Sequence, residues 1–466
     1  MDDKKTQGFV DEHFDKNFVE PLSDFIRIPN LTPAFDPEYH SNGLVDKAIE
    51  FVKDYADSLK IEGLQFHEYK EEGMCPMVVI VYEGAGSPNV MVYGHLDKQP
   101  HMEGWREGTG PVDPKIIDGK LYGRGASDDG YVPFAVLLAM KNAIDQGQTL
   151  PRIALVLETE EESGSIDLVP LLDKCNDWIG TPDYCICLDS GAMDYTSLWL
   201  TSTLRGMIAF NMKVSIAENA VHSGVSGGAI PETFRIANSL LDRIEDPETR
   251  RIPHLEVEIP EAYKEEAKEI AKLSGDFLYT QHNFLDGCKA MNQDNLPELY
   301  LNTNWRPSLA VTGADGLPAL SKAGNVVRAS TTLRCSIRCP PGKNTEEGLK
   351  DTIEILSKDI PYGAKVEFLD QVKGDGWAMK ELSEKTKNVL NDASSKFYGK
   401  ECGKYGIGGS IPFLKVLGDK YPATEILALG VLGPLANAHA PNETLDLPFT
   451  KKFIAALSHI LPGLSN

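Results

Sequence analysis

Residues 90–97 of the chain read Val90-Met91-Val92-Tyr93-Gly94-His95-Leu96-Asp97. The run of β-branched and apolar residues is typical of a buried strand, and the glycine marks its end. His95 and Asp97 then project from the carboxyl end of that strand, where open α/β sheets bind ligands and metal ions. We therefore expect an α/β fold in which further acidic residues and another histidine gather around His95.

The size and charge of the chain limit the classes of protein it can belong to. Its 466 residues exceed what one ordinary core requires, so two domains are the default expectation. A formal net charge of -23 argues against nucleic acid and anionic membranes as partners, because like charges repel. There is no apolar segment of signal-peptide or membrane-spanning length, and the eight cysteines lack zinc-knuckle spacing. These features predict a cytoplasmic protein with reduced thiols.

The periodicity of the apolar residues changes twice along the chain. Up to residue 204, and again after 376, it predicts strands near 76–82, 90–94, 153–157, 184–188 and 426–430 and helices near 9–28, 44–60, 132–144, 379–397 and 449–461. In between, alternating apolar and polar residues predict strands near 207–214, 326–337 and 365–369 and helices near 231–243 and 344–358. We predict a main α/β domain, residues 1–204 and 376–466, interrupted by an α+β domain, residues 205–375.

Several predicted strand ends deliver an acid or a histidine, and one later loop delivers a second histidine. These candidate residues are His95 with Asp97, Asp128, Glu161 with Glu162, Asp189 and His439. Two histidines and three carboxylates suit a pair of divalent ions, because one bridging carboxylate leaves one histidine and one carboxylate for each ion. Adjacent Glu161 and Glu162 point differently, so one can bind metal while the other takes a proton from water. Asp97 can accept a hydrogen bond from the His95 imidazole.

Five motifs of the chain resemble those of the dinuclear-zinc metallopeptidases of the carboxypeptidase/aminoacylase family, and the carnosinase and cytosolic non-specific dipeptidase branch is the most similar. The motifs are Gly94-His95-Leu96-Asp97-x-Gln99-Pro100, Tyr122-Gly123-Arg124-Gly125-x-x-Asp128-Asp129, Glu161-Glu162-Ser163-Gly164-Ser165, His222-Ser223-Gly224 and Asn437-Ala438-His439-x-Pro441-Asn442-Glu443. They occur in the family's order, and the resemblance runs from about residue 10 to 460.

The resemblance implies two Zn2+ ions per subunit, with Mn2+ or Co2+ as alternatives. His95, Asp128 and Asp189 would hold one ion. Asp128, Glu162 and His439 would hold the other, so that Asp128 bridges the pair, and the Asp128–Asp129 peptide bond would be cis. Glu161 would be the general base, and Asp97 would orient His95.

The resemblance also gives the inserted domain a role. It implies a lid domain that forms a homodimer and a catalytic domain whose mixed sheet lies between helices. From the lid, His222 would reach the active site of the partner subunit to stabilise an oxyanion, and Asn325 would approach the substrate. Arg338 would receive the free carboxylate of the substrate together with the loop of Gly409 and Ser410, since a guanidinium and backbone donors suit that task.

The expected activity is hydrolysis of dipeptides or other short peptides. One alternative is a deacylase of N-acyl amino acids on the same metal site. A second is an inactive metal-bound scaffold, which would be expected to have lost the base or a ligand. The chain departs from the family pattern at Lys98, where relatives have an apolar residue, at Gly130-Tyr131, at Arg328, and at Gly406-Ile407, which replaces Arg-Glu. None of these is an expected ligand or base, and Ile407 lies in a segment expected to border the substrate.

Overall fold

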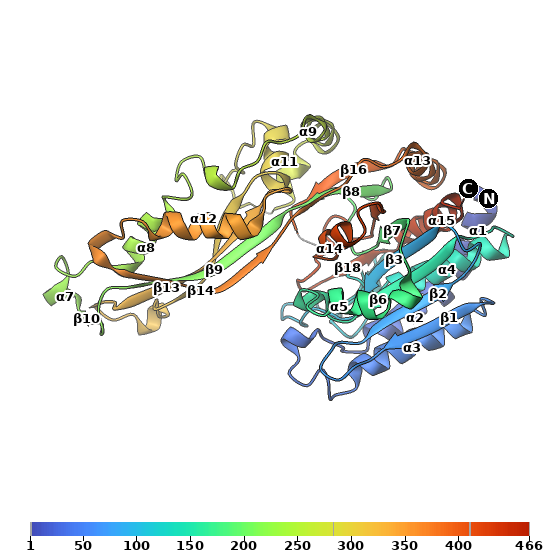
Figure 1. The fold of residues 1–466 in the computed structure, drawn as a ribbon, viewed down its shortest axis with the longest axis horizontal. Coiled ribbons are helices and arrows are strands. Elements are labelled where there is room, and N and C mark those ends of the chain that lie inside the picture. Colours follow the sequence, from blue (N-terminus) through green and yellow to red (C-terminus); the bar gives the residue numbers. More distant parts are fainter. Residues whose placement is uncertain (1, 283, 410–411, 466) are drawn as a thin grey trace. The chain divides into compact units, whose positions relative to one another are not determined.

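The computed structural model describes residues 2–282, 284–409 and 412–465, which divide into two compact units (Figure 1). Of the described residues, 2–202, 379–405 and 412–465 form the first unit. Residues 203–282, 284–378 and 406–409 form the second. Within the described ranges, no helix is both long and apolar enough to cross a membrane.

A six-stranded mixed sheet forms the centre of the first unit, in the order β1-β2-β6-β3-β7-β17. Its strands are β1 (Leu64–Tyr69), β2 (Met77–Tyr82), β3 (Asn89–His95), β6 (Arg152–Glu158), β7 (Tyr184–Cys187) and β17 (Glu425–Ala428). Strand β3 pairs in parallel with β6 and β7, whereas β1–β2 and β2–β6 are antiparallel. Every residue of β3 is buried, as expected of a parallel strand covered on both faces. The predicted mixed sheet is confirmed.

Helices surround this sheet. They are α1 (Asp3–Phe14), α2 (Glu20–Ile26), α3 (Leu44–Ser58), α4 (Val132–Asp145), α5 (Leu168–Lys174), α6 (Asn176–Ile179), α13 (Glu384–Tyr398), α14 (Pro412–Lys420) and α15 (Leu447–Gly463). Helix α15 packs against α1, α4 and α13, and α6 contacts β2 and β6. Short turns of helix lie at η1 (Asp15–Val19), η2 (Pro33–Phe35) and η3 (Glu161–Ser163). Helix α4 is apolar on nearly all sides, which agrees with its burial between the sheet and the other helices.

Two small sheets complete the framework. One has the order β18-β5-β4 and consists of β18 (Thr444–Asp446), β5 (Lys120–Tyr122) and β4 (Lys115–Ile117). It pairs Thr444 with Tyr122, so the segment after His439 is held beside the segment that leads to Asp128. The other has the order β15-β8-β16, from β15 (Trp377–Ala378), β8 (Trp199–Leu204) and β16 (Gly403–Ile407), and its residues are divided between the two units.

The second unit is built on an antiparallel sheet of order β11-β13-β9-β14. Its strands are β9 (Gly206–Ser215), β11 (Ser308–Asp315), β13 (Ser330–Cys339) and β14 (Lys365–Gly374). Burial alternates strictly along β13, and its buried residues face α8 (Thr233–Leu241) and α12 (Thr345–Ser357) in one apolar core. The remaining elements are β10 (Val221–His222), α7 (Ser223–Ser226), η4 (Pro253–Leu255), α9 (Glu261–Ser274), α10 (Phe277–Thr280), α11 (Leu296–Asn304), η5 (Leu320–Lys322), β12 (Val326–Val327) and η6 (Pro361–Gly363).

A buried lysine joins the end of α2 to the loop that follows β3. Lys98 is 1% exposed, and its Nζ donates hydrogen bonds to the carbonyl groups of Phe25 (2.9 Å) and Ile28 (2.6 Å). The backbone of Lys98 is also engaged, because its carbonyl accepts from the amide of Thr32 at 3.0 Å. Burial lowers the pKa of the Lys98 amine to about 7. Lys98 therefore connects the end of α2 to the loop that follows β3, at a position where the resemblance implied an apolar residue.

Replacement of Lys98 by methionine should remove a pH dependence of stability. Because the folded-state pKa is near 7 and an unfolded lysine titrates near ~10.4, unfolding takes up a proton between these values. The cost of burying Lys98 is therefore largest below pH 7 and declines as the pH rises. In denaturant titrations, the free energy of unfolding of the native protein should increase between pH 7 and 9 by about 2 kcal/mol more than that of Lys98→Met. The control is Lys53→Met on the exposed face of α3; a flat difference for Lys98→Met contradicts the assignment.

Candidate metal centre

Parallel strands bring the candidate residues to one edge of the sheet. His95 is the last residue of β3, and it lies opposite Glu158, the last residue of β6. The turn η3, which carries Glu161 and Glu162, begins three residues after β6. Asp189 follows the end of β7 by two residues, and β7 pairs in parallel with β3. The carboxyl ends of three neighbouring strands thus deliver one histidine and three carboxylates to the same place.

Asp128 lies between the two histidines. Its Oδ1 is 3.2 Å from Nε2 of His95, and its Oδ2 is 3.0 Å from Nε2 of His439. His439 Nε2 is also 3.1 Å from Oε2 of Glu162, to which Gln99 donates a hydrogen bond of 2.6 Å. The Asp128–Asp129 peptide bond is cis, as the resemblance implied. Each oxygen of the Asp128 carboxylate therefore faces a different imidazole, which is the arrangement required of a carboxylate shared by two cations.

Asp97 holds the strand end and the acidic turn in a fixed relation. Its backbone carbonyl lies 3.1 Å and its Oδ1 3.3 Å from Nδ1 of His95. The same carboxylate accepts hydrogen bonds from the backbone amides of Glu161 (3.2 Å) and Glu162 (3.0 Å). Asp97 is buried, so these contacts are shielded from water. Its position suits a residue that orients the imidazole and the two glutamates together.

Glu443 is a site residue whose role the sequence analysis missed. It is fully buried, and it accepts hydrogen bonds from Nη1 of Arg124 (2.8 Å) and from the backbone amides of Gly125 (3.0 Å), Ser127 (3.0 Å) and Asp128 (3.2 Å). It therefore shapes the turn that presents Asp128. Glu443 was part of a recognised motif, but only its buried contacts with residues more than 300 positions away reveal what it does.

Asp129 is a second such residue. Its Oδ2 accepts a hydrogen bond of 3.2 Å from the backbone amide of His95, and its side chain is fully buried. A side chain on Gly94 would collide with it, since a Cβ there would lie 2.7 Å from Asp129 Oδ2. The glycine before His95 is therefore required by the close approach of this carboxylate.

The site concentrates negative charge in a buried place. Burial, followed by the charge of Asp189, raises the pKa of Glu161 well above its usual range. Burial likewise raises the pKa of Asp189. Hydrogen bonds to Asp128 and Glu162 raise the pKa of His439 to about 11. Burial opposes the charged form of His95, but its bonds to Asp128 and Asp97 prevail and raise the pKa of its imidazole.

The donor set fits divalent cations. Ligand atoms of His95, Glu161 and Asp189 lie within 4.8 Å of one another, and so do those of His95, Asp128 and Glu162. Oε1 of Glu162 is buried and has no hydrogen-bond partner among the described residues. Imidazole nitrogens and carboxylate oxygens are the ligands that Zn2+ and related ions take in hydrolytic sites. Bound cations would offset the burial and the mutual repulsion that together raise the pKa values of Glu161 and Asp189.

The other predicted site residues belong to the second unit and form two groups. His222, at the end of β10, is exposed, and its Nδ1 accepts a hydrogen bond of 3.0 Å from the amide of Gly224. The carbonyl of Asn325 accepts from the amide of Ser223 at 2.9 Å, so Asn325 lies beside His222.

Arg338 and Gly409 belong to the second group. Arg338 lies near the end of β13 and pairs with Met207 of β9. Burial, followed by the nearby charge of Arg338, lowers the pKa of the Arg205 guanidinium to about 10. Arg205 in turn holds the carbonyl of Gly408, which precedes Gly409, at 3.2 Å. Ser410 lies outside the described residues.

A family model assigns the chain. The model of peptidase family M20/M25/M40 matches residues 91–462, and the chain belongs to this family. A curated relative, the cysteinylglycine-S-conjugate dipeptidase of Corynebacterium striatum, is 26% identical over 440 residues, which cover 92% of each chain. The Cys-Gly metallodipeptidase dug1 of Schizosaccharomyces pombe is 24% identical and covers 95% of this chain and 94% of its own.

Solved structures with similar folds agree with this assignment. The di-peptidase Dug1p of Saccharomyces cerevisiae superposes with a TM-score of 0.78 at 21% identity and covers 100% of this chain and 98% of its own. Human carnosine dipeptidase 1 gives a TM-score of 0.77 at 20% identity, with 99% and 98% covered. At these identities the likeness establishes the fold, including its second domain.

Replacement of Glu443 by glutamine should destabilise the first unit. The amide keeps the shape of the side chain, but it leaves the buried Arg124 guanidinium without its counter-charge and places an NH2 group among backbone donors. We expect a loss of about 3 kcal/mol in the free energy of unfolding, measured by denaturant titration. Glu401→Gln, at an exposed position, is the control. Equal stability of the two variants would show that Glu443 does not hold the Asp128 turn.

Proposed function

We propose that the protein is a metal-dependent dipeptidase that hydrolyses the peptide bond of short peptides with a free carboxylate. The observation that carries the proposal is the Asp128 carboxylate, which faces His95 on one side and His439 on the other. Family membership and the dipeptidase relatives support the substrate class. The substrate of this chain is inferred from these relatives and from its own site.

Two divalent ions, proposed to be Zn2+ with Mn2+ or Co2+ as alternatives, would be held by the buried ligand set. His95, Asp128 and Asp189 would hold one, and Asp128, Glu162 and His439 the other. When bound, such ions supply Lewis-acid polarisation of the scissile carbonyl and lower the pKa of water. Asp97 keeps the His95 imidazole oriented, and Glu443 keeps the Asp128 turn in place.

Glu161 is proposed as the general base. Its backbone amide is fixed by Asp97, and burial raises the pKa of its carboxyl group. A carboxylate with a raised pKa accepts a proton from water more readily and can return it to the leaving amine. Glu161 also belongs to one of the candidate ligand sets, so its role as base must be separated from metal binding by experiment.

His222 and Arg338 are proposed to contact the substrate. Because Nδ1 of His222 accepts the Gly224 amide, the neutral imidazole carries its proton on Nε2, where it can donate to an oxyanion. Arg338 and the backbone near Gly409 are proposed to bind the substrate carboxylate, and Asn325 to approach the substrate from beside His222. Ile407, which departs from the family pattern, has its Cγ2 3.8 Å from where a Cβ on Gly409 would lie. An apolar side chain there favours substrates with an apolar group at that place.

These two groups lie toward opposite ends of the sheet in the second unit. Strand β13 runs from Ser330, which follows the Asn325 segment by five residues, to Arg338 and beyond. Eight residues of extended chain span about 26 Å, which is far longer than a dipeptide. One copy of this unit therefore cannot apply both His222 and Arg338 to a single small substrate. This separation supports the proposal of a homodimer through the second unit, in which His222 serves the active site of the partner subunit.

Replacement of Glu161 by glutamine should abolish activity without loss of metal. With zinc-reconstituted protein and a panel of free dipeptides, tripeptides and N-acyl amino acids, we expect amine release from dipeptides to fall by about a hundred- to ten-thousandfold. The matched control is Glu160→Gln, whose carboxylate instead accepts from the amide of Asp167. Loss of metal from Glu161→Gln would make Glu161 a ligand, and cleavage of acylated substrates alone would make the protein a deacylase.

Co-expression of His222→Ala with Arg338→Met tests the shared site. Each variant alone should be nearly inactive, because each of its active sites lacks one substrate contact. In a mixed dimer, one site combines an intact His222 with an intact Arg338, so random pairing should restore about a quarter of native activity. Activity no higher than that of the single variants would contradict the exchange of His222 between subunits.

A further inference from the structure

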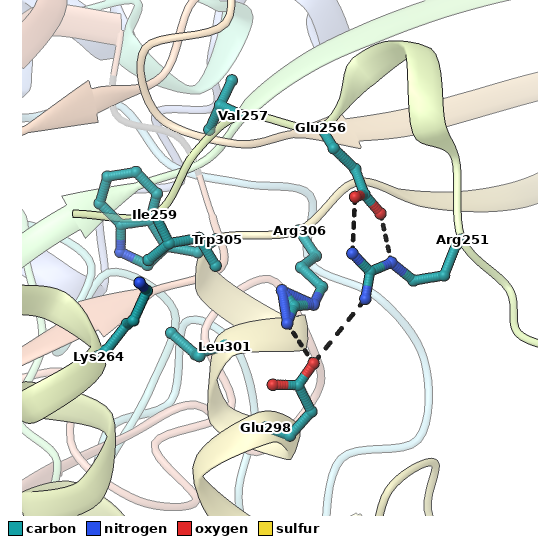
Figure 2. A pocket seen from close by; sticks show the side chains of 9 residues that line it. All are labelled: Arg251, Glu256, Val257, Ile259, Lys264, Glu298, Leu301, Trp305 and Arg306. Atoms are coloured by element: carbon teal, nitrogen blue, oxygen red, sulfur yellow. Dashed lines mark hydrogen bonds and ion pairs between the residues drawn. The ribbon is translucent and has the colours of Figure 1, made fainter. Parts of the chain in front are cut away.

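A pocket of about 210 Å³ opens in the second unit, at α9 and α11, and its lining includes none of the residues assigned above to metal or substrate. It is lined by Arg251, Glu256, Val257, Ile259, Lys264, Glu298, Leu301, Trp305 and Arg306 (Figure 2). At about 30 Å³ per water molecule, this volume holds roughly seven waters or one small organic molecule.

The charged side chains of the pocket are only partly paired with one another. Arg251 donates to both carboxylate oxygens of Glu256, with Nη2 2.6 Å from Oε2. Arg306 and Arg251 both approach the same oxygen of Glu298, Oε1. Three cationic and two anionic side chains leave one positive charge in excess in the lining. Lys264 supplies that excess: among the described residues its ammonium pairs with Glu261, an exposed residue outside the lining, at 3.1 Å.

Two buried donors of this lining have no acceptor. The indole Nε1–H of Trp305 and the Nε–H of Arg306 lack hydrogen-bond partners among the described residues, although Trp305 is only 5% exposed. In Figure 2 the Lys264 ammonium points toward the Trp305 indole. Buried polar groups in native proteins are nearly always satisfied, so such donors require an explanation. Both donor atoms are enclosed by the protein, so the group that a ligand can pair with is the Lys264 ammonium beside the Trp305 ring, where an anionic oxygen would offset the excess charge of the lining.

The other walls of the pocket are apolar. Val257, Ile259 and Leu301 line it together with the face of the Trp305 ring. A ligand that fits this lining combines a carboxylate with a short apolar body.

One side chain connects this pocket to the loop before Gly409. Nη1 of Arg205 donates to the backbone carbonyl of Arg306 at 3.3 Å, and Nε of the same guanidinium donates to the carbonyl of Gly408 at 3.2 Å. A Cβ on Gly408 would lie 3.0 Å from Arg205 Nη2, so this contact is tight. Arg205 therefore links the backbone of Arg306 to that of Gly408 through hydrogen bonds.

We propose that this pocket binds a small organic carboxylate with a short apolar body, and that its occupation lowers the KM for the substrate through Arg306, Arg205 and Gly408. The binding site stands on the pocket alone, whereas the effect on KM rests on the proposed dipeptidase activity. Amino acids released by peptide hydrolysis carry the required carboxylate and side chain. The site would then respond to the concentration of such acids, and therefore to the reactions that supply or consume them.

Calorimetric titration with 4-methylpentanoate, and with the neutral 4-methylpentanamide as the matched probe, tests the binding site on the metal-loaded protein. The pocket variant is Lys264→Met. Its control is Lys268→Met, which removes a lysine from the same helix that also pairs with a glutamate three residues earlier. We expect the acid to bind to the native protein and to Lys268→Met, about five- to tenfold more weakly to Lys264→Met, and the amide to bind no tighter than the acid does to Lys264→Met.

Equal binding of the acid to both variants would place it elsewhere, at the metals or Arg338, and would overturn the proposal, as would absent binding or equal binding of the amide. For dipeptide hydrolysis, the acid should lower KM by about fivefold in the native protein and in Lys268→Met, with kcat unchanged, and by less in Lys264→Met. Competition at the active site would instead raise KM in all three proteins. Binding without any change in KM would overturn the effector role but not the binding site. A lack of dipeptide hydrolysis would count against the proposed function alone, because the calorimetric titration does not depend on turnover.

Discussion

The arrangement of the first unit depends on one buried carboxylate, Asp128, held between two imidazoles. A carboxylate in this position must be compensated, because an unpaired buried charge is strongly unfavourable. His95 and His439 provide that compensation from opposite sides. Glu443 accepts a hydrogen bond from the Asp128 amide, and the Arg124 guanidinium neutralises the charge of Glu443. Segments more than 300 residues apart in sequence therefore form one hydrogen-bonded arrangement around Asp128.

Much of this arrangement around Asp128 could be predicted from local sequence, and part of it could not. The solid apolar run before Gly94 predicted β3, and the histidine and acidic residues after each strand predicted which side chains gather at that edge of the sheet. The role of Glu443 could not be read from its motif, because its partners are the distant Arg124 and backbone amides whose positions depend on the folded turn. Periodicity predicted a helix over 9–28, and the chain is helical without a break from Asp3 to Ile26. The π-helical segment Asp15–Val19 inside it was not predicted; it directly precedes Pro21, which has no amide hydrogen to continue the regular hydrogen-bond pattern.

In the second unit, local sequence predicted still less of the structure. The predicted strand over 326–337 is divided, because Val326–Val327 pairs with β10 whereas β13 pairs with β9 and β11. Pairing partners are not encoded in the alternation of a single strand. Helix α9 was not predicted because only Ala267, Ile270 and Ala271 of its residues are buried, which is a weak apolar stripe. The helices missed in this way line the pocket that holds Trp305 and Lys264.

Anomalous diffraction from zinc-loaded crystals would test most directly whether Asp128 is shared by two ions. The account predicts two peaks at zinc-edge wavelengths, on opposite sides of the Asp128 carboxylate, one next to His95 with Asp189 and the other next to His439 with Glu162. Crystals of Asp128→Ala should lose both peaks, because each ion loses a ligand. A single peak beside His95, with Asp128 bound to one ion only, would contradict the two-ion site and the division of roles built on it.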